Sequence, residues 1–368
     1  MTAAGKSYFR YHFRSKWKLL LCLTAIALVL TLLFASGQKE SWTYYDDDSF
    51  MNEITRENYE WTVGNSVFML IVCGAILPVT EFSVFKKRRN LDCFYGLPVT
   101  RRQMGVVHYA TGLICLFVPF TCAYLLNTLL MLRYPNAFCF GPIVGYYFVS
   151  LLLAWCAYSF NVFAFNQANT TGDGIWFMIL WNFLAWTLLT VVNEISPSVF
   201  GTKEIQYSGG YIGVEPIFEI PNVGMSIYWG AQFEIQAIYE NIVEKIDDTT
   251  LWEFWGDPAY VTWLVPWVAT GIASTLIFFL SFGKRRTEKT EEVSDSWFGF
   301  KMLIPLYAIF LLVGSGGVLI VGVLILAFLG YLIYRRGFHL KLSDWLLLLG
   351  FLLLLIIVLF VDFLNYIL

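Results

Sequence analysis

The feature that most constrains this chain is a series of eight long apolar segments. They cover residues 19–36, 62–85, 104–132, 142–165, 175–193, 259–282, 302–334 and 345–367. A helix needs about 20 apolar residues to cross the roughly 30 Å hydrocarbon core of a bilayer. Hydrophobic residues make up 58% of the chain and charged residues only 14%, against roughly 45–50% and about 25% in soluble proteins. The sequence therefore predicts an all-α, polytopic membrane helical bundle and excludes a soluble enzyme.

The first apolar segment, 19–36, is interpreted as a retained span rather than as a signal peptide. Its apolar core exceeds the roughly 7–15 residues of a signal peptide, and no small-x-small cleavage site follows it. The preceding residues 1–18 place Phe9, Phe13 and Trp17 four residues apart, with basic residues beside them. This spacing predicts an amphipathic helix that lies in the membrane interface.

Segment 302–334 is too long for one crossing, because a straight helix of that length would extend ~50 Å. A Gly-Ser-Gly-Gly cluster at 314–317 predicts a break near its middle. Two interpretations follow: a hairpin with both ends on one side, or one crossing followed by an interfacial piece. With the hairpin, the cytoplasmic segments are 1–18, 86–103, 283–301 and 335–344. Because these hold 19 of the 24 basic residues, the positive-inside rule favours the hairpin, nine spans over eight, and a cytoplasmic N-terminus.

Charge and hydropathy divide the chain into four parts. These are an interfacial helix (1–18), a six-span core (19–282), a charged cytoplasmic linker (283–301) and a C-terminal membrane block (302–368). A long outer loop, 194–258, precedes the last span of the core, and its length of about 65 residues exceeds that of a plain linker. We interpret this loop either as a lid packed on the spans or as an outer gate that contacts exported material.

The sequence contains no recognisable catalytic or metal-binding motif. The patterns GxxxxGK[ST], HExxH and GxSxG are absent, so we expect no ATP hydrolysis and no enzyme activity on this chain. There is no CxxC pair, and His12, His108 and His339 lie far apart with no metal-ligand companion nearby. We therefore predict no metal site and no cofactor on this chain. The nearly balanced charge, 24 basic against 27 acidic residues, predicts no nucleic-acid partner.

Polar side chains inside the predicted spans are candidates for function, because such groups need partners in hydrocarbon. Glu81 lies near the inner end of its span. There it either reaches the interface, pairs with Lys86 or Arg88, or takes part in coupling. Three amides lie in spans three to five: Asn127, Asn161 and Asn182. They are interpreted either as interhelical hydrogen-bonding groups or as the lining of a translocation pathway.

The most specific feature is the cytoplasmic segment 86–103, between spans two and three. It carries six basic residues, which positive-inside topology explains. Topology does not explain why Leu91, Phe94, Tyr95 and Leu97 follow at helical spacing. A short surface helix with an exposed apolar face indicates a protein partner or contact with membrane lipids.

Two motifs in this segment resemble a known family. They are Arg89-Asn90-Leu91-Asp92 and Leu97-Pro98-Val99-Thr100-Arg101-Arg102. Both are similar to the stretch before the third span in permease subunits of bacterial type-2 ABC exporters. The amphipathic start, the six spans and the large outer loop also match the layout of that family. The linker and the C-terminal block are similar to Firmicutes permeases that append extra C-terminal spans.

The resemblance implies that segment 86–103 contains a coupling helix that docks on a separate ABC ATPase subunit. The implied docking residues are the apolar Leu91, Phe94, Tyr95, Leu97 and Pro98, the basic Arg88, Arg89, Arg101 and Arg102, and Asp92 as a cap. ATP and Mg are expected on the ATPase subunit. A second permease, identical or related, is expected to complete the complex in the bacterial plasma membrane.

The function implied by the resemblance is efflux of an amphipathic or hydrophobic substrate, such as a drug, a lipid or an antimicrobial peptide. The same sequence features also fit a membrane sensor or an assembly scaffold that binds a partner without transporting anything. ATP-dependent flux through the reconstituted complex separates the two, because a sensor changes conformation without transport.

Overall fold

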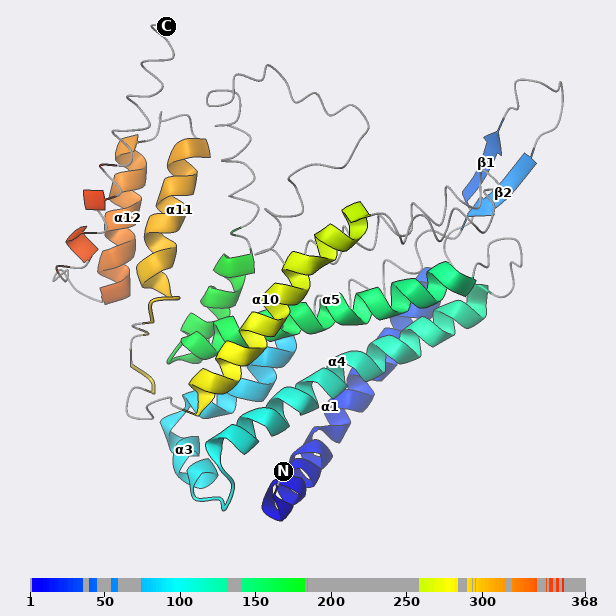
Figure 1. The fold of residues 1–368 in the computed structure, drawn as a ribbon, viewed down its shortest axis with the longest axis horizontal. Coiled ribbons are helices and arrows are strands. Elements are labelled where there is room, and N and C mark those ends of the chain that lie inside the picture. The colour runs from blue at the N-terminus through cyan, green and yellow to red at the C-terminus, as the bar shows by residue number, and fades with distance from the viewer. Residues whose placement is uncertain are drawn as a thin grey trace, which may run out of the picture. The chain divides into compact units, whose positions relative to one another are not determined.

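A computed structural model shows a largely helical chain with one pair of short strands (Figure 1). It describes residues 2–35, 40–44, 54–58, 74–131, 140–182, 184, 258–283, 290–292, 294, 296–314, 320–335, 342, 344–346, 349–350 and 353. The helical class predicted from the sequence is confirmed for this part of the chain. The two strands are an addition to that prediction.

The chain divides into two compact units. Unit 1 comprises Met1–Glu81, Tyr95–Asn161 and Gly224–Gly283, and unit 2 comprises Phe82–Phe94, Val162–Val223 and Lys284–Leu368. Each unit therefore combines segments that lie far apart along the chain.

Unit 1 is built mainly from long helices. They are α1 (Ala3–Ala35), a helix over 74–82, α4 (Arg101–Met131), the larger part of α5 (Phe140–Gln167) and α10 (Pro258–Phe282). The strands β1 (Glu40–Tyr44) and β2 (Ile54–Asn58) pair antiparallel, with Glu40 opposite Asn58.

α1 is one unbroken helix, so the predicted interfacial helix over 1–18 is not a separate element. From Lys6 onward α1 contains neither glycine nor proline, and nothing in the sequence interrupts its backbone hydrogen bonds. The predicted aromatic series is present, with ring centroids 6.0 Å apart for Phe9 and Phe13 and 6.3 Å apart for Phe13 and Trp17. That residues 1–18 lie in the membrane interface stays a prediction.

α1 packs along α4, and the two helices run parallel (Figure 1). The hydroxyl of Thr2 donates to Gln103 Oε1 at 3.4 Å, and six residues further along α1 the Tyr8 hydroxyl lies 2.9 Å from His108 Nε2. The N-terminal ends of α1 and α4 therefore lie at the same end of unit 1.

The helices α4, α5 and α10 meet at a group of hydroxyls around Tyr109. The indole N–H of Trp155 donates to the Tyr109 oxygen at 2.9 Å, and this oxygen lies 2.6 Å from Ser159 Oγ. Ser159 donates its own proton to the Trp155 carbonyl at 2.6 Å, so it accepts one from Tyr109. Thr275 Oγ1 of α10 lies 3.3 Å from the same tyrosine oxygen. Polar contacts of this kind hold helices together where the surroundings are apolar.

α10 approaches α5 most closely at Gly271. A Cβ atom at this position would lie 2.7 Å from Cys156 Sγ and 3.1 Å from Cys156 Cα. Both distances are shorter than a normal van der Waals contact, so the approach requires a residue without a side chain. Small residues commonly allow such approaches between membrane helices.

Unit 2 contains shorter elements. They are η1 (Ser83–Lys86), α3 (Arg88–Tyr95) except for its last residue, a helix over 171–182, α11 (Phe300–Gly314) and α12 (Ile320–Arg335). α11 and α12 are separate helices that pack against each other, and residues 315–319 between them lie outside the described residues. The hydroxyl of Tyr331 donates to the Lys301 carbonyl at 3.1 Å, so the end of α12 returns to the start of α11, as the hairpin interpretation expects.

The linker is anchored to unit 2 rather than extended into solvent where it is described. The backbone N–H of Asn169 donates to Ser294 Oγ at 2.7 Å, and Ser294 Oγ donates to Asp173 Oδ2 at 2.5 Å. The hydroxyl of Tyr334 in α12 donates to the Ser294 carbonyl at 3.2 Å. These bonds explain why the residues after α5 group with the C-terminal block.

Three described helices are long and apolar enough to cross a membrane: Ala3–Leu33, Arg101–Leu130 and Tyr147–Gln167. Val268–Phe282 and Gly322–Leu332 are shorter apolar helices. These lengths support a membrane protein, while the count of eight or nine spans stays a prediction. Nearly all of the outer loop 194–258 lies outside the described residues.

Candidate functional site

The first half of the predicted coupling segment forms η1 and α3, as the helical spacing of its apolar residues predicts. Arg88 starts α3 and contacts the chain's own linker. Its backbone N–H donates to Glu291 Oε1 at 3.1 Å, and its Nε donates to the Thr290 carbonyl at 2.8 Å. Its Nη2 lies 3.7 Å from Glu292 Oε1, with both side chains more than half exposed. Arg88 therefore joins α3 to the linker.

Phe94 anchors α3 from its other end. Its half-buried ring lies 5.6 Å from the ring of Phe85, centroid to centroid. Arg89 is exposed. The side chains of the remaining predicted docking residues of α3, Leu91, Asp92 and Tyr95, lie outside what the structure describes.

The second half of the segment is an exposed turn followed by the start of α4. Leu97 is 39% exposed, and Pro98 is exposed beside it. The backbone N–H of Gln103 donates to Thr100 Oγ1 at 3.3 Å, and that of Thr100 donates to Gln103 Oε1 at 3.4 Å. This reciprocal pair is a capping box, which fixes where a helix begins. Of the two arginines between them, Arg101 is half-buried and Arg102 exposed.

Lys86, one of the two partners predicted for Glu81, has a different role. Its buried ammonium donates to the carbonyl of Phe165 at 2.8 Å and to that of Ala168 at 2.5 Å. It also lies 4.4 Å from the centroid of the Phe165 ring. A cation at the C-terminal end of a helix satisfies the last carbonyls and the helix dipole. Lys86 therefore caps the C-terminal end of α5.

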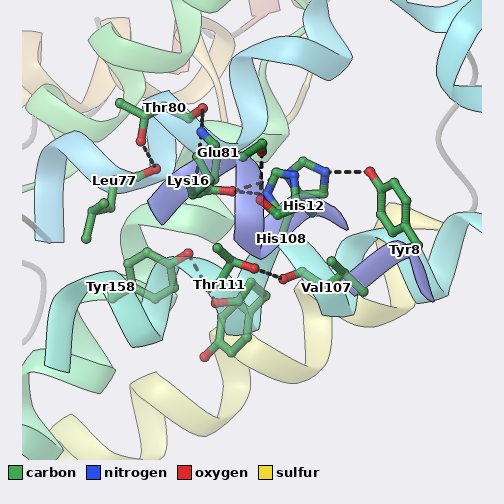
Figure 2. A network of polar contacts seen from close by, with 12 residues as sticks. Tyr8, His12, Lys16, Leu77, Thr80, Glu81, Val107, His108, Thr111 and Tyr158 are labelled. Carbon is green, nitrogen blue, oxygen red and sulfur yellow. Dashed lines mark hydrogen bonds and ion pairs between the residues drawn. The ribbon is translucent and has the colours of Figure 1, made fainter. Parts of the chain in front are cut away.

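Glu81 instead lies at the centre of a buried polar cluster in unit 1 (Figure 2). Its Oε2 lies 2.8 Å from His12 Nε2 and 3.3 Å from His108 Nδ1, and its Oε1 lies 3.1 Å from Lys16 Nζ. The Tyr8 hydroxyl contacts His108 Nε2 at 2.9 Å. We call these five residues, Tyr8, His12, Lys16, Glu81 and His108, the Glu81 cluster.

Three elements build the Glu81 cluster. α1 contributes Tyr8, His12 and Lys16 at spacings of four, which places them on one face of the helix. Glu81 is at the end of the helix over 74–82, and His108 is in the second turn of α4. Lys16 also donates to the Thr80 carbonyl at 3.2 Å, which ties α1 to the neighbour of Glu81.

The cluster corrects two predictions. Glu81 pairs with His12, Lys16 and His108, none of which was predicted as its partner. The histidines were expected to have no metal-ligand companion, yet the ring centroids of His12 and His108 are only 3.9 Å apart, and both rings contact Glu81 (Figure 2). This arrangement could not be read from residue spacing, because His12, Glu81 and His108 lie far apart along the chain. The four-residue spacing of Tyr8, His12 and Lys16 on a predicted helix was the signal available in the sequence.

The three asparagines are not brought together. Asn161 donates to the Gly74 carbonyl at 3.2 Å and so links α5 to the helix over 74–82, as the interhelical interpretation expects. Asn182 donates to the Met178 carbonyl of its own helix at 2.7 Å. Asn127 is buried near the C-terminal end of α4. A pathway role for these residues stays a prediction.

Comparison with protein families, with curated proteins and with solved structures found no match to this chain.

Proposed function

We propose that this chain is the permease subunit of an ABC transporter that exports an amphipathic or hydrophobic substrate. A separate ATPase subunit binds ATP and Mg, and a second permease completes the complex. The observation that carries the proposal is the form of segment 86–103, which is a short surface helix followed by an exposed turn at Leu97 and Pro98. Its motifs are those that resemble the coupling region of type-2 exporter permeases.

A coupling element must present side chains to its partner and also be joined firmly to a membrane helix. The turn at Leu97 meets the first condition because its apolar side chain is 39% exposed. The capping box of Thr100 and Gln103 supports the second, since it fixes the start of a 31-residue helix immediately after the turn. A push on the turn is then transmitted to α4. ATP drives such a motion only if the ATPase binds two states of the permease with different affinity.

The contacts also show which residue gives the cleanest test. Phe94 packs on Phe85 inside its own unit, so an acidic residue there would damage α3 as well as any docking surface. Leu97 is exposed, so Leu97→Asp alters the surface with little change inside the protein. If Leu97 is a hot spot at the centre of the interface, its loss costs about 2 kcal/mol, or roughly 30-fold in affinity.

The experiment is copurification from cells that express the chain together with its neighbouring genes. We expect the wild-type chain to recover a subunit with a GxxxxGK[ST] motif, and Leu97→Asp to lose it. The matched control is Leu342→Asp, because Leu342 is 78% exposed and lies in another segment predicted to be cytoplasmic. The control should recover the ATPase as the wild type does.

Two results would contradict the proposal in different ways. Full retention of the ATPase by Leu97→Asp would remove the docking role of the turn but leave a transporter. Recovery of the wild-type chain without any nucleotide-binding subunit, together with no ATP-dependent flux after reconstitution, would overturn the transporter and favour the sensor or scaffold.

A further inference from the structure

We propose that His12, Glu81 and His108 bind a divalent transition-metal ion, with zinc as the expected metal. Each residue offers one ligand atom, and these atoms all lie within 4.8 Å of one another. His12 Nε2 and His108 Nδ1 both face Glu81 Oε2. Two imidazoles and a carboxylate are ligands that zinc and its first-row neighbours accept. The inference depends only on unit 1 and is independent of the proposed transport function.

The distances between the ligand atoms suit a shared ion. In a tetrahedral zinc site with bonds of about 2.0–2.2 Å, neighbouring ligand atoms are about 3.3 Å apart. Glu81 Oε2 lies 2.8 Å from His12 Nε2 and 3.3 Å from His108 Nδ1. The ligands come from three different elements whose backbones are already packed together, so binding requires only small movements of the two rings.

The outer partners of the ligands are also those that metal sites use. The ring nitrogen of His108 that does not face Glu81 contacts the Tyr8 hydroxyl at 2.9 Å, which fixes the ring orientation. The carboxylate oxygen that does not face the histidines contacts Lys16 Nζ at 3.1 Å. Groups of this kind hold the metal ligands in place, and their loss typically costs about 10–100-fold in metal affinity.

The burial of the three ligands indicates that the ion would stabilise the packing of the helices. Glu81 is 0% exposed, His108 1% and His12 7%. An ion held by three elements at this depth would clamp the N-terminal half of α1 to the start of α4, and its fourth position would take a water or a small anion. Without an ion, Glu81 and Lys16 already balance each other in charge, and the cluster is a hydrogen-bonded ion pair. The experiment must therefore distinguish a metal site from this metal-free ion pair.

The experiment uses the full chain, purified in detergent without a histidine tag, stripped with a chelator and titrated with Co²⁺. We expect one Co²⁺ per chain, visible absorption bands of nitrogen- and oxygen-ligated Co²⁺, and loss of these bands when Zn²⁺ is added, because zinc binds such sites more tightly than cobalt. A folded wild-type chain that shows no such bands at saturating Co²⁺ would overturn the proposal, whatever the variants do.

Four variants assign the site. His12→Gln and His108→Gln should remove the bands, whereas His339→Gln, which changes the one histidine outside the cluster, should keep them. Tyr8→Phe should weaken Co²⁺ binding about tenfold. Tyr11→Phe is its matched control, because Tyr11 is 73% exposed on the same helix, and it should leave the affinity unchanged. Bands that survive both His12→Gln and His108→Gln would place the ion elsewhere and refute this assignment.

Discussion

The Lys86 ammonium donates a hydrogen bond of 2.8 Å to the backbone carbonyl of Phe165, 79 residues further along the chain. The same ammonium bonds the Ala168 carbonyl and lies over the Phe165 ring. A basic residue that topology alone would place in a cytoplasmic loop is thus buried, and it joins η1 to the end of α5. Its neighbour Lys87 is exposed, so two adjacent lysines have different roles.

The first prediction concerns this pair of lysines. Lys86→Met should lower the free energy of unfolding by about 1–3 kcal/mol, because it removes two charge-assisted hydrogen bonds to backbone carbonyls at the end of α5. Lys87→Met should change it little. Thermal unfolding followed by tryptophan fluorescence, at equal scan rates, measures the stability of both variants. The buried Trp181 serves as a probe because it lies in unit 2 with Lys86. Equal shifts for the two variants would show that the Lys86 bonds add nothing.

The second prediction concerns the hydroxyl group around Tyr109. Tyr109→Phe should destabilise unit 1 by about 1 kcal/mol, since the Trp155 N–H loses its acceptor and Ser159 its donor. The reactivity of Cys115 and Cys156 with a thiol dye during heating reports this, because both are buried in the same unit. Tyr11→Phe, at an exposed tyrosine, is the control. An unchanged midpoint for Tyr109→Phe would mean that ordinary packing suffices there.

The third prediction concerns the close approach at Gly271. Gly271→Ala should destabilise the chain by about 1–3 kcal/mol, because the new methyl group overlaps Cys156 and forces α10 away from α5. Gly322→Ala is the control, since a Cβ there would meet nothing within 4 Å. Alanine is the better helix former, so the control should be neutral or slightly stabilising. A Gly271→Ala chain as stable as the wild type would show that the two helices separate at no cost.

The fourth prediction concerns the ion pair between Arg335, the last residue of α12, and Asp344. Arg335 Nε donates to Asp344 Oδ2 at 2.8 Å and its Nη2 donates to Oδ1 at 2.9 Å, while Asp344 is fully buried. Arg335→Met should cost about 3–5 kcal/mol, because it leaves a buried charge without its main partner. The double change Arg335→Met with Asp344→Leu should recover most of that loss. A double variant no better than the single one would contradict the pairing.

The sequence was sufficient for features that depend on local composition. The length of α1 agrees with a sequence that lacks glycine and proline from Lys6 onward. The separation of α11 from α12 agrees with the break predicted from the glycine cluster at 314–317. In each case the residues that decide the structure lie within a few turns of one another.

The features that escaped prediction depend on contacts between distant segments. The partners of Glu81 lie 69 and 27 residues away, at His12 and His108. Nearby basic residues such as Lys86 carry the charge that would suit it, so sequence proximity favoured them as partners. Which of several cations a buried carboxylate meets is decided by how the helices pack, and helical periodicity gives only the face on which each residue lies. The same holds for Tyr109, whose partners come from α5 and α10.

The parallel packing of α1 and α4 has a consequence for membrane sidedness. Thr2 lies beside Gln103, six residues from Leu97, and both helices leave this end of unit 1 in the same direction. A cysteine introduced at Thr2 and one introduced at Leu97 must therefore react with a membrane-impermeant maleimide from the same compartment. One labelling measurement at the start of the chain thus locates the proposed docking turn without disturbing it.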